Sequence, residues 1–265
     1  MSDRLSPDQV REFWTEQAQA HGQAPDASWS DVQVIHLEIE KMLEYIADGD
    51  RLLDIGCANG YSTSRFAEAR RIDAVGVDYI PAMIDAARER AAAQAGRHVG
   101  SVRFDVGDIL DLDPSLKGFD KVVVTRVLIN LGTWERQQAG LAASLEALAP
   151  GGLLLLSEAT IQGWERLNRF RREWELPDIP MPGFNQYLDQ DRVIEAAGAC
   201  ADLVTVSHFA STYYAATRVF KPLLSRATGG RVDPTNPLAE FNRWAAALPA
   251  AGDYGVQRLF VFRKR

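Results

Sequence analysis

Short apolar runs alternate with segments of helical period along most of this chain. Apolar runs typical of buried strands lie at residues 51–54, 72–78, 102–106, 119–131, 154–157, 201–209 and 254–262. Helical patterns occupy residues 31–47, 61–69, 81–96, 133–148, 164–175, 189–198, 211–226 and 236–248. Such an alternation predicts an α/β fold with a doubly wound parallel sheet, whose ligands bind at the carboxyl ends of the strands.

The pattern also assigns faces to the helix that precedes the first strand. Within residues 31–47, Ile35, Ile39 and Met42 recur at helical spacing and form an apolar stripe. His36 and Glu38 lie off that stripe. We therefore expect both of these side chains to be exposed to solvent.

A loop of small residues follows the first predicted strand. Gly56, Ala58 and Gly60 lie between Asp54 and a helical pattern that begins at Tyr61. A loop of this kind lets backbone approach a ligand at a helix N-terminus, where N–H groups are free to donate. The dinucleotide spacing G-x-G-x-x-G is absent, which disfavours a pyrophosphate site.

The order Asp-Ile-Gly-Cys-Ala-Asn-Gly at 54–60 resembles motif I of the class I S-adenosylmethionine-dependent methyltransferases, usually D-x-G-x-G-x-G. Ala58 departs from that motif, and we expect the loop to form provided that position 58 needs no positive φ. Three later elements match the same family in order, namely a strand ending in Asp78, the Val-Gly-Asp-Ile of 106–109 and the Leu-Ala-Pro-Gly-Gly of 148–152. The resemblance covers residues 50–158.

This resemblance implies a Rossmann-like, mostly parallel, seven-stranded sheet whose last strand is antiparallel. It also implies S-adenosylmethionine as cofactor and S-adenosylhomocysteine as product. Asp78 follows Asp54 by twenty-four residues, near the spacing at which a carboxylate meets a ribose diol, although acids at strand ends also cap turns. The predicted cofactor-binding residues are Trp14, Asp54, Gly56, Asn59, Gly60, Asp78, Tyr79, Met83, Asp108, Ile109 and Arg126.

Segments outside the matched core are predicted to close over it. Residues 1–30 form an N-terminal lid, and residues 31–265 a methyltransferase domain with insertions at about 159–188 and 211–250 that form a substrate cap. Trp14 and Trp29 are candidate lid residues, with packing of the leader onto the core as the alternative. The predicted substrate-binding residues are Trp29, Asn130, Asn185, Tyr187, Tyr214 and Arg218.

Two residues are candidates for a general base. Glu158 follows the fifth strand, and His208 ends the next one with an ordinary imidazole pKa near 6.5 that suits proton uptake. Each has a structural alternative: Glu158 would anchor the insertion through an ion pair, and His208 would cap a strand end. A hydroxyl acceptor needs such a base, whereas an amine acceptor needs only to arrive neutral.

The composition and net charge of the chain restrict the kinds of partner that we expect it to have. The net charge of −7 disfavours a nucleic-acid partner, and no apolar run is long enough to span a bilayer, so we expect a cytoplasmic protein that acts without a membrane. Two distant cysteines, Cys57 and Cys200, and four scattered histidines indicate neither a disulfide scaffold nor a metal site. We expect a small-molecule acceptor and a monomer or homodimer.

The leading hypothesis is a methyltransferase that acts on oxygen or nitrogen of a sugar or natural-product intermediate. Two insertions rich in aromatic residues around one cleft motivate it. A protein-, nucleic-acid- or carbon-directed methyltransferase is one rival. A nicotinamide-dependent oxidoreductase is a second, and a non-catalytic or repurposed binder of the cofactor is a third.

Overall fold

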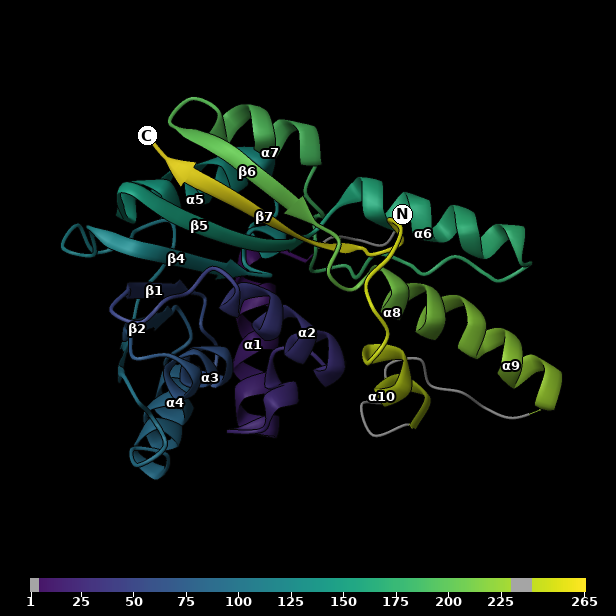
Figure 1. Cartoon of the computed structure of the whole chain (residues 1–265), viewed down its shortest axis with the longest axis horizontal. Helices are drawn as coiled ribbons and strands as arrows, with labels where there is room; N and C mark the ends of the chain where they lie inside the picture. The colour runs from purple at the N-terminus through teal and green to yellow at the C-terminus, as the bar shows by residue number, and fades with distance from the viewer. Residues whose placement is uncertain (1–4, 230–239) are drawn as a thin grey trace.

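A seven-stranded sheet forms the centre of the protein (Figure 1). The computed structural model describes residues 5–229 and 240–265. The strands follow the order β3-β2-β1-β4-β5-β7-β6, and only β7 runs antiparallel to its neighbours. This arrangement confirms the predicted fold class. The strands are β1 (Arg51–Ile55), β2 (Asp73–Asp78), β3 (Ser101–Val106), β4 (Phe119–Thr125), β5 (Leu148–Ala159), β6 (Ala201–Ser207) and β7 (Gln257–Lys264).

Helices cover both faces of the sheet. One face carries α2 (Val32–Leu43), α3 (Tyr61–Ala69) and α4 (Pro81–Ala93), and the other carries α5 (Trp134–Ala147) and α7 (Gln190–Ala197) (Figure 1). Because both faces are covered, the central strands are apolar at consecutive positions, and Val122, Val123 and Val124 are all fully buried. The core therefore lies on both sides of β1, β4 and β5.

The remaining helices lie outside this frame. An arm of α6 (Ile161–Glu173) and the run α8 (Ser211–Ala215), η3 (Ala216–Phe220) and α9 (Lys221–Thr228) extends away from the sheet, with α10 (Glu240–Ala246) beside it (Figure 1). The predicted helix 211–226 thus has a π-helical middle turn. Residues 236–239 of the predicted helix 236–248, and residues 230–239 of the predicted cap 211–250, lie outside the described residues.

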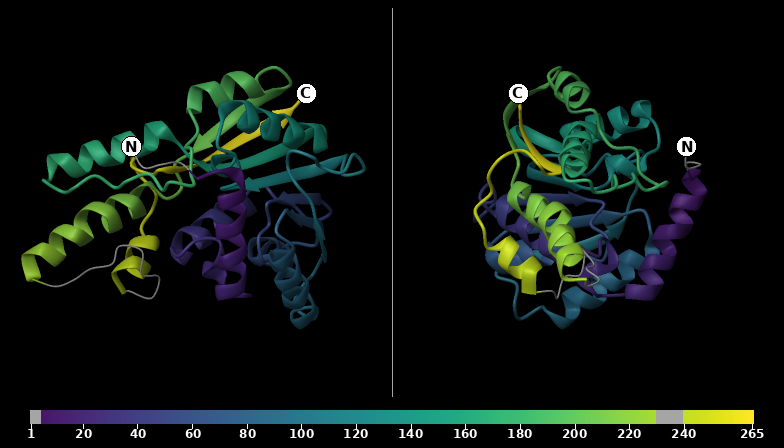
Figure 2. Two further views of the ribbon diagram at one scale, coloured as in Figure 1. Left: turned by 180° about the vertical axis from the view of Figure 1, so that it is seen from behind. Right: turned by 90° about the vertical axis from the view of Figure 1, so that its right-hand side faces the viewer.

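The N-terminal helix α1 (Pro7–His21) lies along the face of the molecule that is turned to the viewer in the left view of Figure 2. Ser6 caps it in a reciprocal pair with Gln9, which fixes its first turn. Near its start, the Leu5 amide donates to the Gly183 carbonyl at 3.2 Å. Past its end, Gln23 donates to Glu89 on α4 at 3.2 Å. The helix thus connects the 174–189 segment with α4.

Two expectations from periodicity are wrong. The strand predicted for 119–131 ends at Thr125, because Arg126 adopts a φ of 56° and the chain turns into η2 (Leu128–Asn130). Glu38, expected to be exposed, is only 1% exposed, because Arg126, Ser157 of β5 and Gln257 of β7 supply polar partners for it inside the fold. His36 is half-buried and bonds the Tyr61 hydroxyl at 2.8 Å.

Among residues 5–229 and 240–265, no helix is both long enough and apolar enough to cross a bilayer.

Candidate functional site

The loop between β1 and α3 is built on left-handed backbone. Gly56, Ala58 and Gly60 have φ values of 74°, 48° and 70°. A Cβ at Gly56 would lie 2.2 Å from Val127 Cγ2, so only glycine fits there. The condition attached to position 58 is not met, since Ala58 does need a positive φ and adopts it under strain.

Asp78, at the end of β2, holds this loop in place. Its Oδ2 accepts from the Ala58 amide at 3.0 Å, and its Oδ1 accepts from the Ile80 amide at 2.9 Å. Burial raises the pKa of Asp78 to about 6, and the two backbone donors oppose that rise. The carboxylate therefore fixes the bend and still forms part of a cavity wall.

That cavity lies at the carboxyl ends of β1, β2 and β4. It encloses about 800 Å³, open solvent at its mouth included. Nine of the predicted site residues line it, namely Trp14, Gly56, Asp78, Tyr79, Met83, Asp108, Ile109, Arg126 and Asn130. Sequence reasoning missed Ser28, Ile55, Ala58, Ile80, Gly107, Thr125, Val127, Leu131 and Arg136. All of these but Arg136 are chain neighbours of predicted residues, and Arg136 carries no sequence signal.

Asp54 lies beneath the loop instead of in the cavity wall. Its Oδ2 accepts from the Thr63 hydroxyl at 2.6 Å, and the side chain is 2% exposed. Burial raises the pKa of Asp54 to about 7, and the Thr63 hydroxyl opposes that rise. Asp54 therefore braces the start of α3 from below the loop.

Asn59 and Gly60 also lie behind the cavity wall. The Asn59 amide group donates to the carbonyls of Gly22 and Ala24 at 2.9 and 2.7 Å, which attaches the N-terminal segment to the loop. Gly60 is the N-cap residue of α3, and a Cβ there would lie 2.6 Å from the Phe104 ring. The structure gives both residues a part in shaping the loop.

Arg126 connects the cavity to a buried polar group. Its guanidinium lies 2.5 Å from a Glu38 carboxylate oxygen and 5.1 Å from the centre of the Trp29 ring. Glu38 also accepts from the Ser157 hydroxyl and, at 3.3 Å, from Gln257. Trp29 thus covers Arg126 from outside the cavity wall. Glu38 is a residue that sequence reasoning missed, because its pattern predicts a solvent-facing position.

Glu158 does not reach the cavity. Its carboxylate accepts from the amides of Val127 and Leu128 at 2.8 Å and of Ile129 at 3.4 Å. Burial raises the pKa of Glu158 to about 8, and these three donors oppose that rise. Glu158 thus fixes η2, the turn that carries Asn130 to the cavity.

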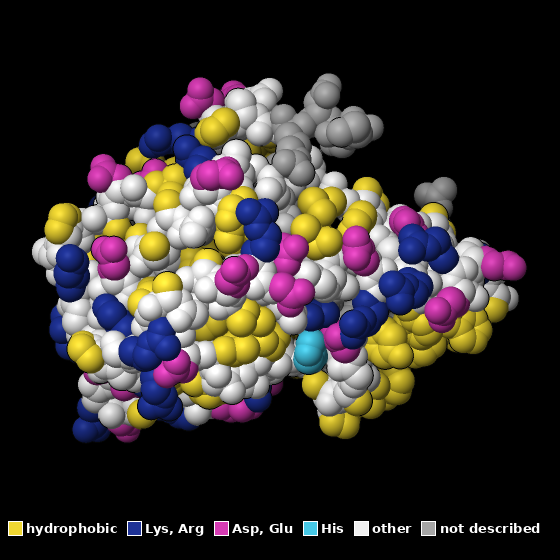
Figure 3. Space-filling model, turned by 90° about the horizontal axis from the view of Figure 1, so that it is seen from above, with side chains coloured by type: hydrophobic (Ala, Val, Ile, Leu, Met, Phe, Trp, Pro, Cys, Tyr) yellow, Lys and Arg dark blue, Asp and Glu magenta, His cyan; other side chains and the backbone are white. Residues whose placement is uncertain are grey.

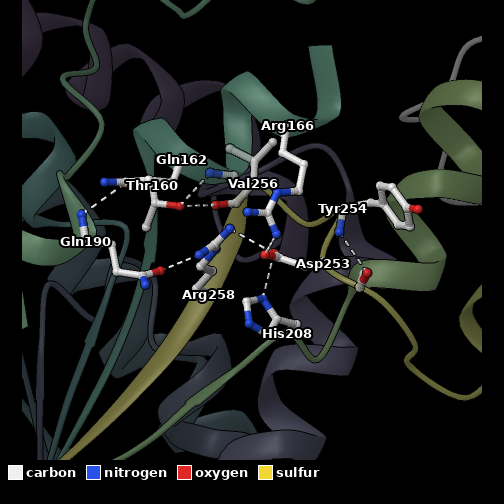
Figure 4. Close-up of polar contacts among 11 residues, drawn as sticks. Thr160, Gln162, Arg166, Gln190, His208, Asp253, Tyr254, Val256 and Arg258 are labelled. Atoms are coloured by element: carbon white, nitrogen blue, oxygen red, sulfur yellow. Dashed lines mark hydrogen bonds and ion pairs between the residues drawn. The ribbon is translucent and has the colours of Figure 1, made fainter. Parts of the chain in front are cut away.

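His208 lies in a different place. It lines a second cavity, between α2 and residues 246–252. Its Nδ1 is 2.9 Å from Asp253, whose carboxylate also contacts Arg166 and Arg258. Figure 4 shows these three side chains directed at Asp253 from three different elements. Burial and the two arginines lower the pKa of His208.

Four of the predicted substrate residues fall into two groups. Asn130 lies in the cavity wall, and Asn185 lies near it in the 174–189 segment, because the Gln186 amide donates to the Ile129 carbonyl at 2.7 Å. Tyr214 and Arg218 lie in the arm, with the guanidinium 5.0 Å from the Tyr214 ring centre and 2.5 Å from Asp31.

Tyr187 is half-buried, and burial raises its pKa to about 12. It packs against the core of the sheet and does not line the cavity. Of the six predicted substrate residues, only Asn130 lies in the cavity wall.

The strand order and the cavity at the carboxyl ends define a Rossmann-like protein of the class I methyltransferase fold. Residues 53–154 match the family described as a methyltransferase domain. Over residues 53–154 the chain is thus similar to a methyltransferase domain, and its fold is that of the class I S-adenosylmethionine-dependent methyltransferases.

Two curated relatives are similar over part of their length. Demethylmenaquinone methyltransferase of Deinococcus radiodurans is 34% identical over 109 residues, 41% of this chain and 42% of that protein. A tRNA U34 carboxymethyltransferase of Pseudomonas fluorescens is 27% identical over 169 residues, 58% of this chain and 46% of that protein. The chain therefore spans less than half the length of either relative.

A solved structure is similar over nearly the whole chain. Magnesium protoporphyrin IX methyltransferase of Synechocystis, with bound S-adenosylhomocysteine, superimposes with a TM-score of 0.63 over 98% of this chain and 100% of that one. The two sequences are 12% identical, so the likeness is one of fold.

Proposed function

We propose that this protein transfers a methyl group from S-adenosylmethionine to an oxygen or nitrogen of a small-molecule acceptor. One observation carries the proposal: the buried Asp78 carboxylate shares a cavity wall with the Gly56 bend at the carboxyl ends of adjacent parallel strands. In open α/β sheets this is the edge where ligands bind.

The cavity suits the cofactor chemically. Apolar side chains of Ile80, Met83 and Ile109 suit the faces of an adenine, and Asp108 lies beside them to accept from its amine. Asp78 would accept from the ribose hydroxyls, and the bend at Gly56 brings backbone close to the amino-acid portion. Trp14 on α1 would cover the bound molecule.

The bound cofactor supplies an electrophilic methyl group attached to a sulfonium. The chain itself aligns the acceptor and excludes water. Together these effects lower the activation barrier to methyl transfer. No histidine or glutamate is among the described residues of the cavity wall. We therefore assign Glu158 and His208 to positioning and structural roles, and the mechanism to proximity and orientation.

A small acceptor is favoured over a nucleic acid. On the face seen in Figure 3, Lys and Arg side chains are interspersed with Asp and Glu and form no continuous basic patch. The overall charge of −7 agrees with that distribution. A sugar or natural-product intermediate remains our proposed acceptor, and a tRNA acceptor would contradict the proposal.

Asp78 offers the direct test. We expect Asp78→Ala to weaken binding of S-adenosylhomocysteine roughly tenfold or more in calorimetric titration, because a charged hydrogen-bond acceptor is lost. Asp78→Asn keeps one acceptor oxygen and should lose less. Asp85→Ala, which removes an exposed acid of α4, is the matched control and should bind like the parent.

Two further measurements separate the rivals. Titration with a nicotinamide dinucleotide should show no binding, whereas the oxidoreductase alternative requires it. Transfer of a labelled methyl group from the cofactor into a metabolite extract should yield a labelled small molecule. Binding without any transfer would favour the non-catalytic alternative.

A further inference from the structure

A buried carboxylate behind the cavity wall holds one of the side chains that form that wall. Glu38 of α2 is 1% exposed, and its carboxylate lies 2.5 Å from the Arg126 guanidinium. The Ser157 hydroxyl and the Gln257 side chain donate to the same carboxylate. A buried charge is stable only when such partners compensate it. Glu38 is therefore fixed by donors from three other parts of the chain.

Arg126 has donors left over after this contact. Its Nη1 bonds Glu38, whereas its Nε and Nη2 have no acceptor within the described residues and are not buried. The side chain is 14% exposed and lines the cavity. The Trp29 ring covers the guanidinium from outside the cavity wall, with 5.1 Å between Arg126 Cζ and the ring centre. The direction left open to the two nitrogen atoms is therefore the cavity.

Strand order places Arg126 at one end of the cavity. Strands β1 and β4 are parallel neighbours, so the Gly56 bend lies beside the residues that follow β4. A Cβ on Gly56 would lie 2.2 Å from Val127 Cγ2, so the two loops are in contact. Asp108 follows β3, at the opposite end of the order β3-β2-β1-β4. Arg126 thus lies beside the bend to which we assign the amino-acid portion of the cofactor, and away from the adenine.

The amino-acid portion of S-adenosylmethionine carries a carboxylate. A guanidinium presents its N–H groups in a planar fork that matches a carboxylate through two parallel hydrogen bonds. The Nε and Nη2 atoms of Arg126 form one edge of that fork, and the contact with Glu38 uses the other nitrogen. Because Glu38 fixes the side chain in advance, less rotamer freedom is lost when a ligand binds.

We propose that Glu38 is a positioning residue, which holds Arg126 so that its Nε and Nη2 meet the carboxylate of the cofactor's amino-acid portion. This inference rests on the proposed function and gives a role to a residue that the sequence pattern places at the surface. Ser157 and Gln257 share in compensating the Glu38 carboxylate, so Arg126 still attracts a second carboxylate.

The test compares two ligands that differ only in this carboxylate. Calorimetric titration of the full chain with S-adenosylhomocysteine and with its decarboxylated form gives a ratio of dissociation constants, which we call the carboxylate preference. The parent should favour S-adenosylhomocysteine roughly tenfold or more, and Arg126→Gln should reduce that preference to below about threefold. General structural damage would weaken both ligands alike and leave the ratio unchanged.

Three variants separate position from charge. Glu38→Met removes the acceptor and should reduce the preference as Arg126→Gln does, whereas Glu38→Gln keeps one acceptor oxygen and should retain more of it. Arg126→Lys keeps the charge but lacks the planar fork, so it should lose the preference without any change to the buried carboxylate. A lysine variant with the parent's preference would contradict the positioning role, since charge alone would then suffice.

Arg136→Gln is the matched control. It removes the same charge from the same cavity wall, but from α5. A Cβ on Gly140, one turn further along α5, would contact Ile109, on the side of the cavity away from Arg126. The control should keep the parent's carboxylate preference. An equal loss of preference in Arg136→Gln and Arg126→Gln would overturn the proposal.

Binding by the parent separates this inference from the proposed function. If the parent binds neither ligand, the proposed function and this inference fall together. If the parent binds both ligands equally, or if Arg126→Gln keeps the full preference, this inference alone is wrong.

Discussion

Single residues around the cavity hold conformations and charges that their own sequence neighbourhood does not impose. Ala58 is held at positive φ by its hydrogen bond to Asp78, and Glu158 is buried against the backbone of a turn thirty residues earlier in the chain. Both arrangements carry a free-energy cost that substitution can measure.

Ala58→Gly should stabilise the protein. A left-handed φ costs an L-residue roughly 1–2 kcal/mol, and glycine's extra freedom in the unfolded chain offsets roughly 0.5–1 kcal/mol of the gain. We expect the free energy of unfolding in urea to rise by up to about 1 kcal/mol. Ala92→Gly, within α4, should lower it by a similar amount. A loss of stability in both variants would refute the assignment of strain to position 58.

Glu158→Gln should change how stability depends on pH. The folded protein raises the pKa of Glu158 to about 8, so folding favours the protonated form. The contribution of that proton to stability is complete below the unfolded pKa of about 4.5 and is lost as pH rises through 8. In urea titrations from pH 5 to pH 8, the free energy of unfolding of the parent should therefore fall relative to that of the variant, which has no carboxyl group to titrate. The fall should be at most about 1.4 kcal/mol per pH unit.

The control for this measurement is Glu146→Gln, which removes an exposed acid at the end of α5 and should leave the pH dependence unchanged. The same Glu158 variant tests the mechanism. Labelled methyl transfer should persist in Glu158→Gln, since its carboxylate faces amides and not the cavity. Loss of transfer with cofactor binding intact would restore Glu158 as the general base.

Whole elements meet at the mouth of the cavity. Helix α1 contributes Trp14 to the cavity wall, and Phe184 of the 174–189 segment contacts both Phe13 and Trp14. The Leu5 amide adds a hydrogen bond to the Gly183 carbonyl at 3.2 Å. This aromatic contact attaches the predicted lid to the predicted substrate cap.

Phe184→Ala should speed release of S-adenosylhomocysteine. An aromatic pair contributes about 0.5–1.5 kcal/mol beyond the area it buries, so the dissociation rate in stopped-flow measurements should rise roughly two- to tenfold. Phe220→Ala, which removes a half-exposed ring on the arm, should leave that rate unchanged. An unaltered rate for Phe184→Ala would mean that α1 does not close the exit.

At the scale of the molecule, the hydrophobic pattern of the sequence predicts the sheet and its covering helices, but it predicts the arm only in part. Each predicted strand and covering helix is present, because strands buried on both faces need consecutive apolar residues, but the end of β4 and the start of β5 each differ from the prediction by six residues. The arm was predicted as two helical insertions, but its direction away from the sheet depends on contacts such as that of Arg171 with the Arg218 carbonyl.

The sequence by itself determined the order of strands and helices, the glycine-rich bend and the acid that ends β2. These features follow from local periodicity and from the conformations that small residues allow. Tertiary structure alone decided that Glu38 is buried against Arg126, that Asn59 holds the N-terminal segment and that Glu158 caps a turn. Each of these contacts joins residues at least thirty positions apart, and a local pattern carries no information about which distant group will satisfy a buried polar atom.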